Sequence, residues 1–256
     1  MLLTLEHGAV RELRLDRPPA NALSPDLIAA LTQAITEAPQ DNVRALIISG
    51  APGMFSAGLD VPLLLTLDRP AIAAAWRDLY ALMRAVACST IPIAAAITGH
   101  APAGGTVIAL FCDCRVMAEG DWKMGLNEVQ VGLPLPPVIL AALKRQIGPR
   151  QAERLAVGGL LLSPAEAADI GLVDELVPSE CVAERAIEWC QRLLALPSEA
   201  MLSTRRQSRA DLVALFDQDF EHELNQMLAN WWSPGAQTVL RAMVERLGKK
   251  VKGTSL

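Results

Sequence analysis

Hydrophobic and polar residues follow two different rhythms along this chain. Residues 3–6 and 10–15 alternate between apolar and polar side chains, which is typical of strands with one buried face. Residues 43–49 and 91–98 are mostly apolar, and each segment stops before a glycine, so they predict strands buried inside a sheet. The pattern predicts three further strands, at 114–118, 122–125 and 172–177.

Helical patterns separate these strands and fill the rest of the chain. Ser24 caps a predicted helix that has Pro25 in its first position and runs to Ala38. Ser163 and Glu166 match a capping box, which predicts a short helix that ends at Gly171. Further helices are predicted over residues 70–88, 104–110, 137–147, 150–157, 180–196, 198–209, 211–231 and 234–247.

The order of these elements predicts the fold class. Strands and helices alternate from residue 43 to residue 177, and only helices follow. This order is typical of an α/β chain with a parallel sheet, here extended by a helical C-terminal quarter. The tail 248–256 is polar and contains glycine, so we expect it to be loose.

Composition and charge exclude several classes of protein. The chain has 256 residues, of which 52% are hydrophobic and 20% charged, so it is not intrinsically disordered. Its net charge of −5 disfavours nucleic-acid binding, which requires a basic face. No apolar run approaches the roughly 18 residues of a membrane span, and the start MLLTLEHG lacks the pattern of a signal peptide. We therefore expect a cytoplasmic protein that binds neither nucleic acid nor membrane.

Cysteine and histidine give no sign of a metal site. The five cysteines have no metal-binding spacing, and the chain has only three histidines. We expect reduced cysteines that pack as small hydrophobic residues.

Two loops rich in small residues are candidates for binding chemistry. Residues 54–60 (MFSAGLD) and 99–106 (GHAPAGGT) each follow a buried strand, and ligands of open α/β sheets bind at such strand ends. Small residues let a ligand approach the backbone, whose free N–H groups can bind an oxyanion. A helix that starts near Gly104 adds the positive end of its dipole. The alternative is that the glycines serve only tight packing. Fingerprints for dinucleotides, phosphate loops and serine hydrolases are absent.

A third segment, 125–134 (GLNEVQVGLP), carries a candidate base. Glu128 stands among the apolar residues Leu126, Val129, Val131 and Leu133, and a carboxylate in apolar surroundings has a raised pKa that suits a general base. The alternative is a carboxylate on a solvated edge.

Together, the order and spacing of the three segments resemble the crotonase superfamily, the enoyl-CoA hydratases and isomerases. Residues 17–23 (RPPANAL) and 163–174 (SPAEAADIGLVD) are also similar to family stretches, so the resemblance covers nearly the whole chain. It implies a spiral ββα core over residues 1–197, which binds acyl-CoA and carries out catalysis. It also implies a helical region over 198–256 that forms a homotrimer or homohexamer and covers the active site.

The resemblance also implies roles for individual residues. The backbone N–H groups of Leu59 and Gly104 correspond to those that hold the thioester oxygen of an acyl-CoA and stabilise an enolate. Coenzyme A is part of the substrate, so no separate cofactor is implied. The implied substrate-binding or coenzyme A-binding residues are Ser56, Ala57, Gly58, Asp60 and Gly105. For Asp60 we favour a structural role, in which local hydrogen bonds fix its own loop.

One departure from the hydratase pattern points to a particular reaction. Hydratases of this family use two glutamates, and the corresponding positions here are Val107 and Glu128. Hydration needs one group to orient water and another to manage the proton, whereas a single carboxylate suffices to move a proton from C2 to C4. The loops at 100–105 and 125–132 are similar to those of mitochondrial-type Δ3,Δ2-enoyl-CoA isomerases, which implies isomerisation of 3-enoyl-CoA in fatty-acid β-oxidation. The alternatives are another crotonase reaction (hydration, thioester hydrolysis or decarboxylation) or a catalytically silent acyl-CoA-binding protein.

The sequence leaves three smaller points open. His100 either contacts the substrate or is satisfied by the backbone of its loop. Asn127 supports either Glu128 or the loop that carries it. Trp231 and Trp232 either serve an intramolecular core contact or pack against neighbouring subunits and cover the acyl site.

Overall fold

A six-stranded sheet forms the centre of the molecule in the computed structural model, which describes residues 1–253. In spatial order its strands are β1 (Leu2–His7), β2 (Val10–Leu15), β3 (Ala45–Ser49), β5 (Ile93–Ile97), β7 (Cys114–Ala118) and β9 (Glu175–Val177). Strand β1 pairs antiparallel with β2, and every other pair is parallel. Every residue of β3, β5 and β7 is buried, because helices cover both faces of the sheet.

A second, smaller parallel sheet continues three of these strands. It contains β4 (Gly53–Met54), β6 (Gly99–Pro102) and β8 (Met124–Gly125), which follow β3, β5 and β7 along the chain. A Cβ on Gly99 would lie 2.1 Å from the carbonyl carbon of Gly53, so the backbones of β4 and β6 touch and only glycine fits at position 99. The loops after β4 and β6 thereby leave the sheet side by side.

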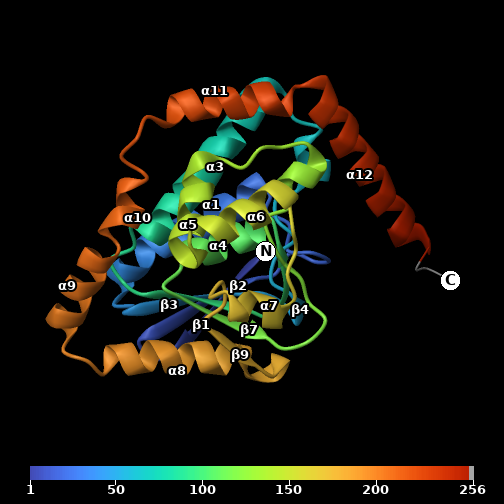
Figure 1. The fold of residues 1–256 in the computed structure, drawn as a ribbon. Helices are drawn as coiled ribbons and strands as arrows, with labels where there is room; N and C mark the ends of the chain where they lie inside the picture. The colour runs from blue at the N-terminus through green and yellow to red at the C-terminus, as the bar shows by residue number, and fades with distance from the viewer. Residues whose placement is uncertain (254–256) are drawn as a thin grey trace.

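Helices pack on both faces of the large sheet (Figure 1). The helix α8 (Val182–Leu194) lies against one face, over β3, β5 and β7, where alanines such as Ala94 and Ala96 let it approach. The opposite face is covered by α1 (Pro25–Glu37), α3 (Arg69–Ala87), α4 (Gly104–Phe111), α5 (Pro137–Ile147) and α6 (Pro149–Gly158). The remaining short elements are η1 (Ala38–Asp41), α2 (Val61–Leu64), η2 (Glu128–Val131), α7 (Pro164–Asp169) and η3 (Ser179–Cys181).

The C-terminal helices wrap around the outside of this layered core (Figure 1). They are α9 (Ser198–Ser208), α10 (Ala210–Ala214), α11 (Phe220–Trp231) and α12 (Pro234–Gly253). The helix α11 packs along α3, where Trp231 meets Trp76 edge-on with ring centroids 6.1 Å apart and Phe220 stacks on Tyr80 at 4.0 Å. The helix α12 contacts η2 and α2. Trp231 thus makes the intramolecular core contact, whereas Trp232 is 36% exposed.

The α/β prediction and most of the predicted helices are confirmed, but three predictions are wrong. Residues 211–231 do not form one helix, because the side chain of Asp219 accepts a hydrogen bond from the Glu221 N–H and starts α11 anew. The tail is not loose up to residue 253, since it continues α12, in which an interior glycine such as Gly248 costs only about 1 kcal/mol. Residues 254–256 lie outside the described residues. Residues 172–174 precede β9 rather than belong to it.

No helix in the described part of the chain is long and apolar enough to cross a membrane.

Candidate active site

A cavity of about 760 Å³ opens where the loops after β4 and β6 meet η2. Its walls come from segments 17–22, 57–62, 102–107 and 127–139. Trp76 and Leu79 of α3 also line it, and Met227, Asn230 and Met243 of the C-terminal helices complete the lining.

Two glycines bring the first two candidate loops into direct contact. A Cβ on Gly58 would lie 2.8 Å from the backbone nitrogen of Gly104, and a Cβ on Gly104 would lie 2.9 Å from the Cα of Gly58. Gly58 also has a φ of +85°, which other residues rarely adopt. Any side chain at either position would push the loops apart.

The peptide units beside these glycines aim their N–H groups in defined directions. In a planar trans peptide the C=O and N–H bonds point in opposite directions. The Gly58 carbonyl accepts a hydrogen bond from the Leu23 N–H at 2.8 Å, so the Leu59 N–H points away from Leu23. The Ala103 carbonyl accepts from the Val107 N–H at 2.9 Å, so the Gly104 N–H points out of the start of α4. Within residues 1–253 neither N–H has an acceptor, and both residues line the cavity.

The turn before α4 holds the Gly104 N–H in place. Ala103 has φ 49° and ψ −119°, a conformation that is strained for a residue with a Cβ. Its N–H donates to the Gly125 carbonyl at 2.8 Å, which ties the turn to β8. Two N–H groups of this kind, one of them at a helix N-terminus, can stabilise negative charge on a carbonyl oxygen.

Hydrogen bonds tie the third candidate segment to the same place. The Thr106 hydroxyl donates to the Ala101 carbonyl at 2.6 Å and accepts from the Gly125 N–H at 2.8 Å. The chain then passes into the 3-10 turn η2, which begins at Glu128 and is closed by Gly132 in the left-handed conformation. The structure thus brings Leu59, Gly104 and Glu128, one from each candidate segment, to the wall of one cavity.

Glu128 is a carboxylate in apolar surroundings. Its Oε2 atom is buried and has no hydrogen-bond partner among the described residues. Burial raises the pKa of Glu128 to about 7. Val107, 2% exposed and also lining the cavity, has an aliphatic side chain that offers no hydrogen bond to a ligand. The other carboxylate in the cavity wall, Asp60, differs because its Oδ2 atom is paired with Arg17 at 2.6 Å.

The remaining candidate residues divide into two groups. Ala57 and Asp60 line the cavity. Ser56, Gly58 and Gly105 lie behind its wall. The Ser56 hydroxyl is fully buried, donates to the Asn21 carbonyl and accepts from the Gly58 N–H. A Cβ on Gly105 would lie 2.5 Å from the Ser56 carbonyl oxygen, so this glycine permits close packing.

His100 and Asn127 have distinct positions. The Nδ1 atom of His100 accepts a hydrogen bond from the Lys123 N–H at 3.0 Å, and its ring packs edge-on against Trp122. His100 does not line the cavity and is satisfied by backbone, whereas Asn127 lines the cavity beside Glu128. Segment 17–22 also contributes to the cavity wall, a role that its sequence motif did not indicate.

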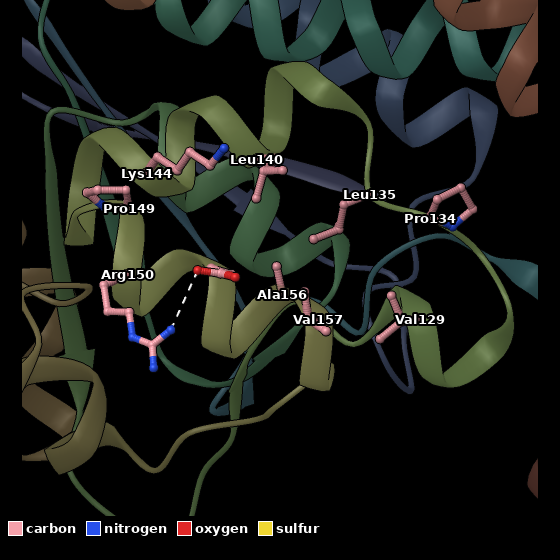
Figure 2. Close-up of a pocket in the computed structure, with 10 residues that line it drawn as sticks. Val129, Pro134, Leu135, Leu140, Lys144, Pro149, Arg150, Ala156 and Val157 are labelled. Atoms are coloured by element: carbon pink, nitrogen blue, oxygen red, sulfur yellow. Dashed lines mark ion pairs between the residues drawn. The ribbon is translucent and has the colours of Figure 1, made fainter.

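A second hollow of about 710 Å³ is lined by residues of η2, α5 and α6 and of the loop before α5 (Figure 2). Its lining is mostly apolar, and it also holds the ion pair between Arg150 and Glu153 at 3.7 Å. It contains neither Glu128 nor either N–H group, so the chemistry is concentrated in the first cavity. Among residues 1–253 no group of three or more metal-ligating side chains is placed to hold a metal ion.

Comparison with known proteins identifies the class to which this fold and site belong. Residues 6–246 match the family model described as enoyl-CoA hydratase/isomerase. The crystal structure of human mitochondrial delta3-delta2-enoyl-CoA isomerase superimposes with a TM-score of 0.92 at 30% identity, over 97% of this chain and 98% of that one. The molecule therefore has the crotonase fold.

Sequence relatives carry the assignment one step further. The chain is 32% identical to human mitochondrial enoyl-CoA delta isomerase 1 over 257 residues, which covers 99% of this chain and 85% of the relative. It is also 34% identical to a probable enoyl-CoA hydratase of Mycobacterium bovis over 194 residues, with 75% and 74% covered. The chain belongs to the enoyl-CoA hydratase/isomerase family, and its relatives bear both isomerase and hydratase names.

Proposed function

We propose that this protein is a Δ3,Δ2-enoyl-CoA isomerase, which moves the double bond of a 3-enoyl-CoA to give trans-2-enoyl-CoA in fatty-acid β-oxidation. One observation carries the proposal: Glu128 is the cavity's single carboxylate without a cationic partner in the described structure, and the apolar Val107 lines the same cavity. These lining residues suit a reaction that needs one base and no second group to orient water.

The proposed mechanism combines the two backbone N–H groups with the Glu128 carboxylate. The thioester oxygen accepts hydrogen bonds from the N–H groups of Leu59 and Gly104, which form an oxyanion hole. The Glu128 carboxylate removes a proton from C2, and the electron pair spreads over the thioester and the former double bond as a dienolate. Glu128 then returns the same proton to C4, so atoms and charges balance. A donor aimed at the developing oxyanion contributes about 100- to 1,000-fold to turnover.

The state of Glu128 suits both halves of this proton transfer. A base is most effective when its pKa lies near the working pH, because it must both accept and release the proton. Burial places the pKa of Glu128 at about 7, which meets this condition. Coenzyme A enters as part of the substrate, and the mechanism calls for no separate cofactor.

Hydration is the rival reaction, because one of the relatives is named a probable enoyl-CoA hydratase. Adding water to a 2-enoyl-CoA requires a group that holds the water as well as a group that manages the proton. The aliphatic side chain of Val107 cannot hydrogen-bond a water molecule, which favours isomerisation over hydration. A silent acyl-CoA-binding protein is disfavoured because the buried, unpaired Oε2 of Glu128 is unfavourable for stability and has no structural partner within the described chain.

We further propose a homotrimer or homohexamer, with residues 1–197 responsible for acyl-CoA binding and catalysis and residues 198–256 for assembly and cover. Met227 and Met243 in the cavity lining support the covering role. Large apolar side chains on the surface, with Val157 76% and Val129 39% exposed, support self-association. The expected cytoplasmic location stays a prediction.

A spectrophotometric assay with paired substrates tests the proposed reaction. We expect turnover of 3-enoyl-CoA thioesters and little or no hydration of 2-enoyl-CoA thioesters of the same length. Glu128→Gln should bind the thioester and lose at least about 100-fold in turnover. Glu153→Gln, an exposed glutamate on α6, is the matched control and should keep wild-type activity. Wild-type turnover by the Glu128→Gln variant would place the base elsewhere and overturn the mechanism.

A further inference from the structure

A chain of hydrogen bonds links a positive charge to the Leu59 N–H. Arg17 donates through Nη1 to the Ala22 carbonyl at 3.2 Å. The next peptide N–H, that of Leu23, donates to the Gly58 carbonyl at 2.8 Å. The N–H that follows Gly58 is that of Leu59, which has no acceptor among the described residues. Two peptide units, Ala22–Leu23 and Gly58–Leu59, therefore connect the guanidinium group to the Leu59 N–H.

This arrangement gives the Leu59 N–H both a direction and a greater polarity. Each peptide unit carries its C=O and N–H on opposite sides, so fixing the Ala22 carbonyl fixes the Leu23 N–H and, through Gly58, the Leu59 N–H. Hydrogen bonds in such a series polarise one another, and a charged donor at one end strengthens the effect. The free N–H at the far end is thereby made a better donor.

Asp60 adds further hydrogen bonds to the same network, here called the frame, which joins segment 17–23 to the loop 54–60. Its Oδ2 atom binds Arg17 Nη2 at 2.6 Å, while its Oδ1 atom accepts from the Leu63 N–H at 3.1 Å and caps α2. Its own N–H donates to the Leu23 carbonyl at 3.1 Å. Leu59 is therefore flanked on both sides by backbone hydrogen bonds to Leu23.

Asn21 fastens the rest of this frame. It adopts a φ of 48°, and its side-chain oxygen accepts from the Arg17 N–H at 2.8 Å. Its Nδ2 atom donates to the carbonyls of Met54 and Phe55, both at 3.1 Å. The Ala57 N–H donates to the Ala20 carbonyl at 2.9 Å. Hydrogen bonds to segment 17–23 thus fix the conformation of the loop 54–60.

We propose that Arg17 is a positioning residue of the oxyanion hole, which aims and polarises the Leu59 N–H through the Ala22–Leu23 and Gly58–Leu59 peptides while Asp60 anchors its guanidinium group. The proposal rests on the proposed acyl-CoA chemistry of this site. It assigns Asp60 to the support of Leu59 rather than to a contact with coenzyme A, in line with the local role favoured from the sequence.

Two variants separate the parts of the frame. Arg17→Gln keeps a hydrogen-bond donor but removes the charge and the ion pair. Asp60→Asn keeps the cap of α2 and leaves Arg17 free to bind the Ala22 carbonyl. Misaligning one oxyanion donor should lower kcat by about 10- to 50-fold in Arg17→Gln, less than complete loss of a donor. The effect in Asp60→Asn should be smaller. Arg145→Gln, which breaks the exposed ion pair with Asp211, is the matched control and should leave kcat unchanged.

A binding measurement keeps the test independent of the isomerase reaction. Acetoacetyl-CoA at alkaline pH presents an enolate oxygen to the site, whereas butyryl-CoA presents a neutral thioester. We expect Arg17→Gln to weaken acetoacetyl-CoA about 10-fold or more relative to butyryl-CoA, whose Kd should change by less than about two-fold. This selectivity applies to any reaction that passes through an enolate, so it stands even where the wild type fails to isomerise 3-enoyl-CoA.

Three outcomes would overturn the proposal. Equal weakening of both ligands by Arg17→Gln would indicate a contact with the coenzyme A moiety instead. Unchanged kcat and unchanged selectivity with a lower Tm would indicate a role in stability alone. An effect of Asp60→Asn larger than that of Arg17→Gln would show that the ion pair, not the peptide chain, is what matters. Where Arg17→Gln does not fold, Arg17→Lys gives the same comparison, because an ammonium cannot serve the Ala22 carbonyl and Asp60 in the same geometry.

Discussion

The buried carboxylate of Glu128 should make the protein less stable as the pH rises, and Glu128→Gln should remove that penalty. Burial raises the pKa of Glu128 from an ordinary 4.5 to about 7 in the folded chain. Between these values the folded state holds a proton that the unfolded state has lost, so the free energy of unfolding falls as the pH rises. A difference of about 2.5 in pKa, at about 1.4 kcal/mol per unit, amounts to about 3 kcal/mol above pH 8.

Comparing the two proteins at pH 5 and pH 8 isolates this effect. Glutamine has nearly the same shape and does not ionise, and every other titrating group is common to both proteins. The stability advantage of Glu128→Gln should therefore grow by about 2 to 3 kcal/mol from pH 5 to pH 8, a Tm difference of about 5–10 °C. Denaturant unfolding followed by circular dichroism measures the first quantity, and a thermal scan at fixed protein concentration measures the second.

The same variant gives the outcome that would refute the reasoning. A stability difference that stays constant to within about 0.5 kcal/mol between pH 5 and pH 8 would mean that Glu128 is solvated and ionises normally. Glu153→Gln, on the surface of α6, is the matched control for replacing a glutamate by glutamine. Glu128→Gln should thus be more stable at pH 8 and inactive, because the property that suits a base is the one that costs stability.

Four further predictions concern activity and assembly. The value of kcat/KM should fall below an apparent pKa of about 7 as Glu128 becomes protonated, and a profile flat from pH 5 to pH 9 would contradict this. Val107→Glu should introduce trace hydration of 2-enoyl-CoA, seen as loss of enoyl absorbance. Gly104→Ala should lower kcat at least about 10-fold, because its Cβ would lie 2.9 Å from the Gly58 Cα and separate the two N–H donors; full activity would refute that role. Light scattering should give three or six times 27.4 kDa, and a monomer at micromolar concentration would exclude the proposed assembly.

The sequence predicted the elements whose own pattern specifies them. Buried strands such as β3 and β5 are continuous apolar segments, and α1 carries its cap at Ser24 within the local sequence. The apolar neighbours of Glu128 were likewise visible, and they predicted the carboxylate in apolar surroundings that the structure shows. These features depend on side chains close together along the chain, so local rules suffice for them.

Short elements escaped the same rules because long-range contacts form them. The strands β4 and β6 are too short for a periodic pattern, and they exist because glycine lets their backbones touch at Gly53 and Gly99. The break between α10 and α11 depends on the cap at Asp219 competing with a helical pattern that continues on both sides.

The three segments that carry the candidate site, and their places along the chain, were thus predicted from the sequence alone. How the two N–H donors are aimed was decided only by the tertiary structure. Leu59 and Gly104 belong to different loops. They come together because the backbones of Gly58 and Gly104 are too close to leave room for a Cβ atom on either residue. The direction of the Leu59 N–H depends on Leu23 and on Arg17, which are distant in sequence. Hydrogen bonds between remote peptides leave no periodic trace in a sequence, because any residue supplies the same backbone groups.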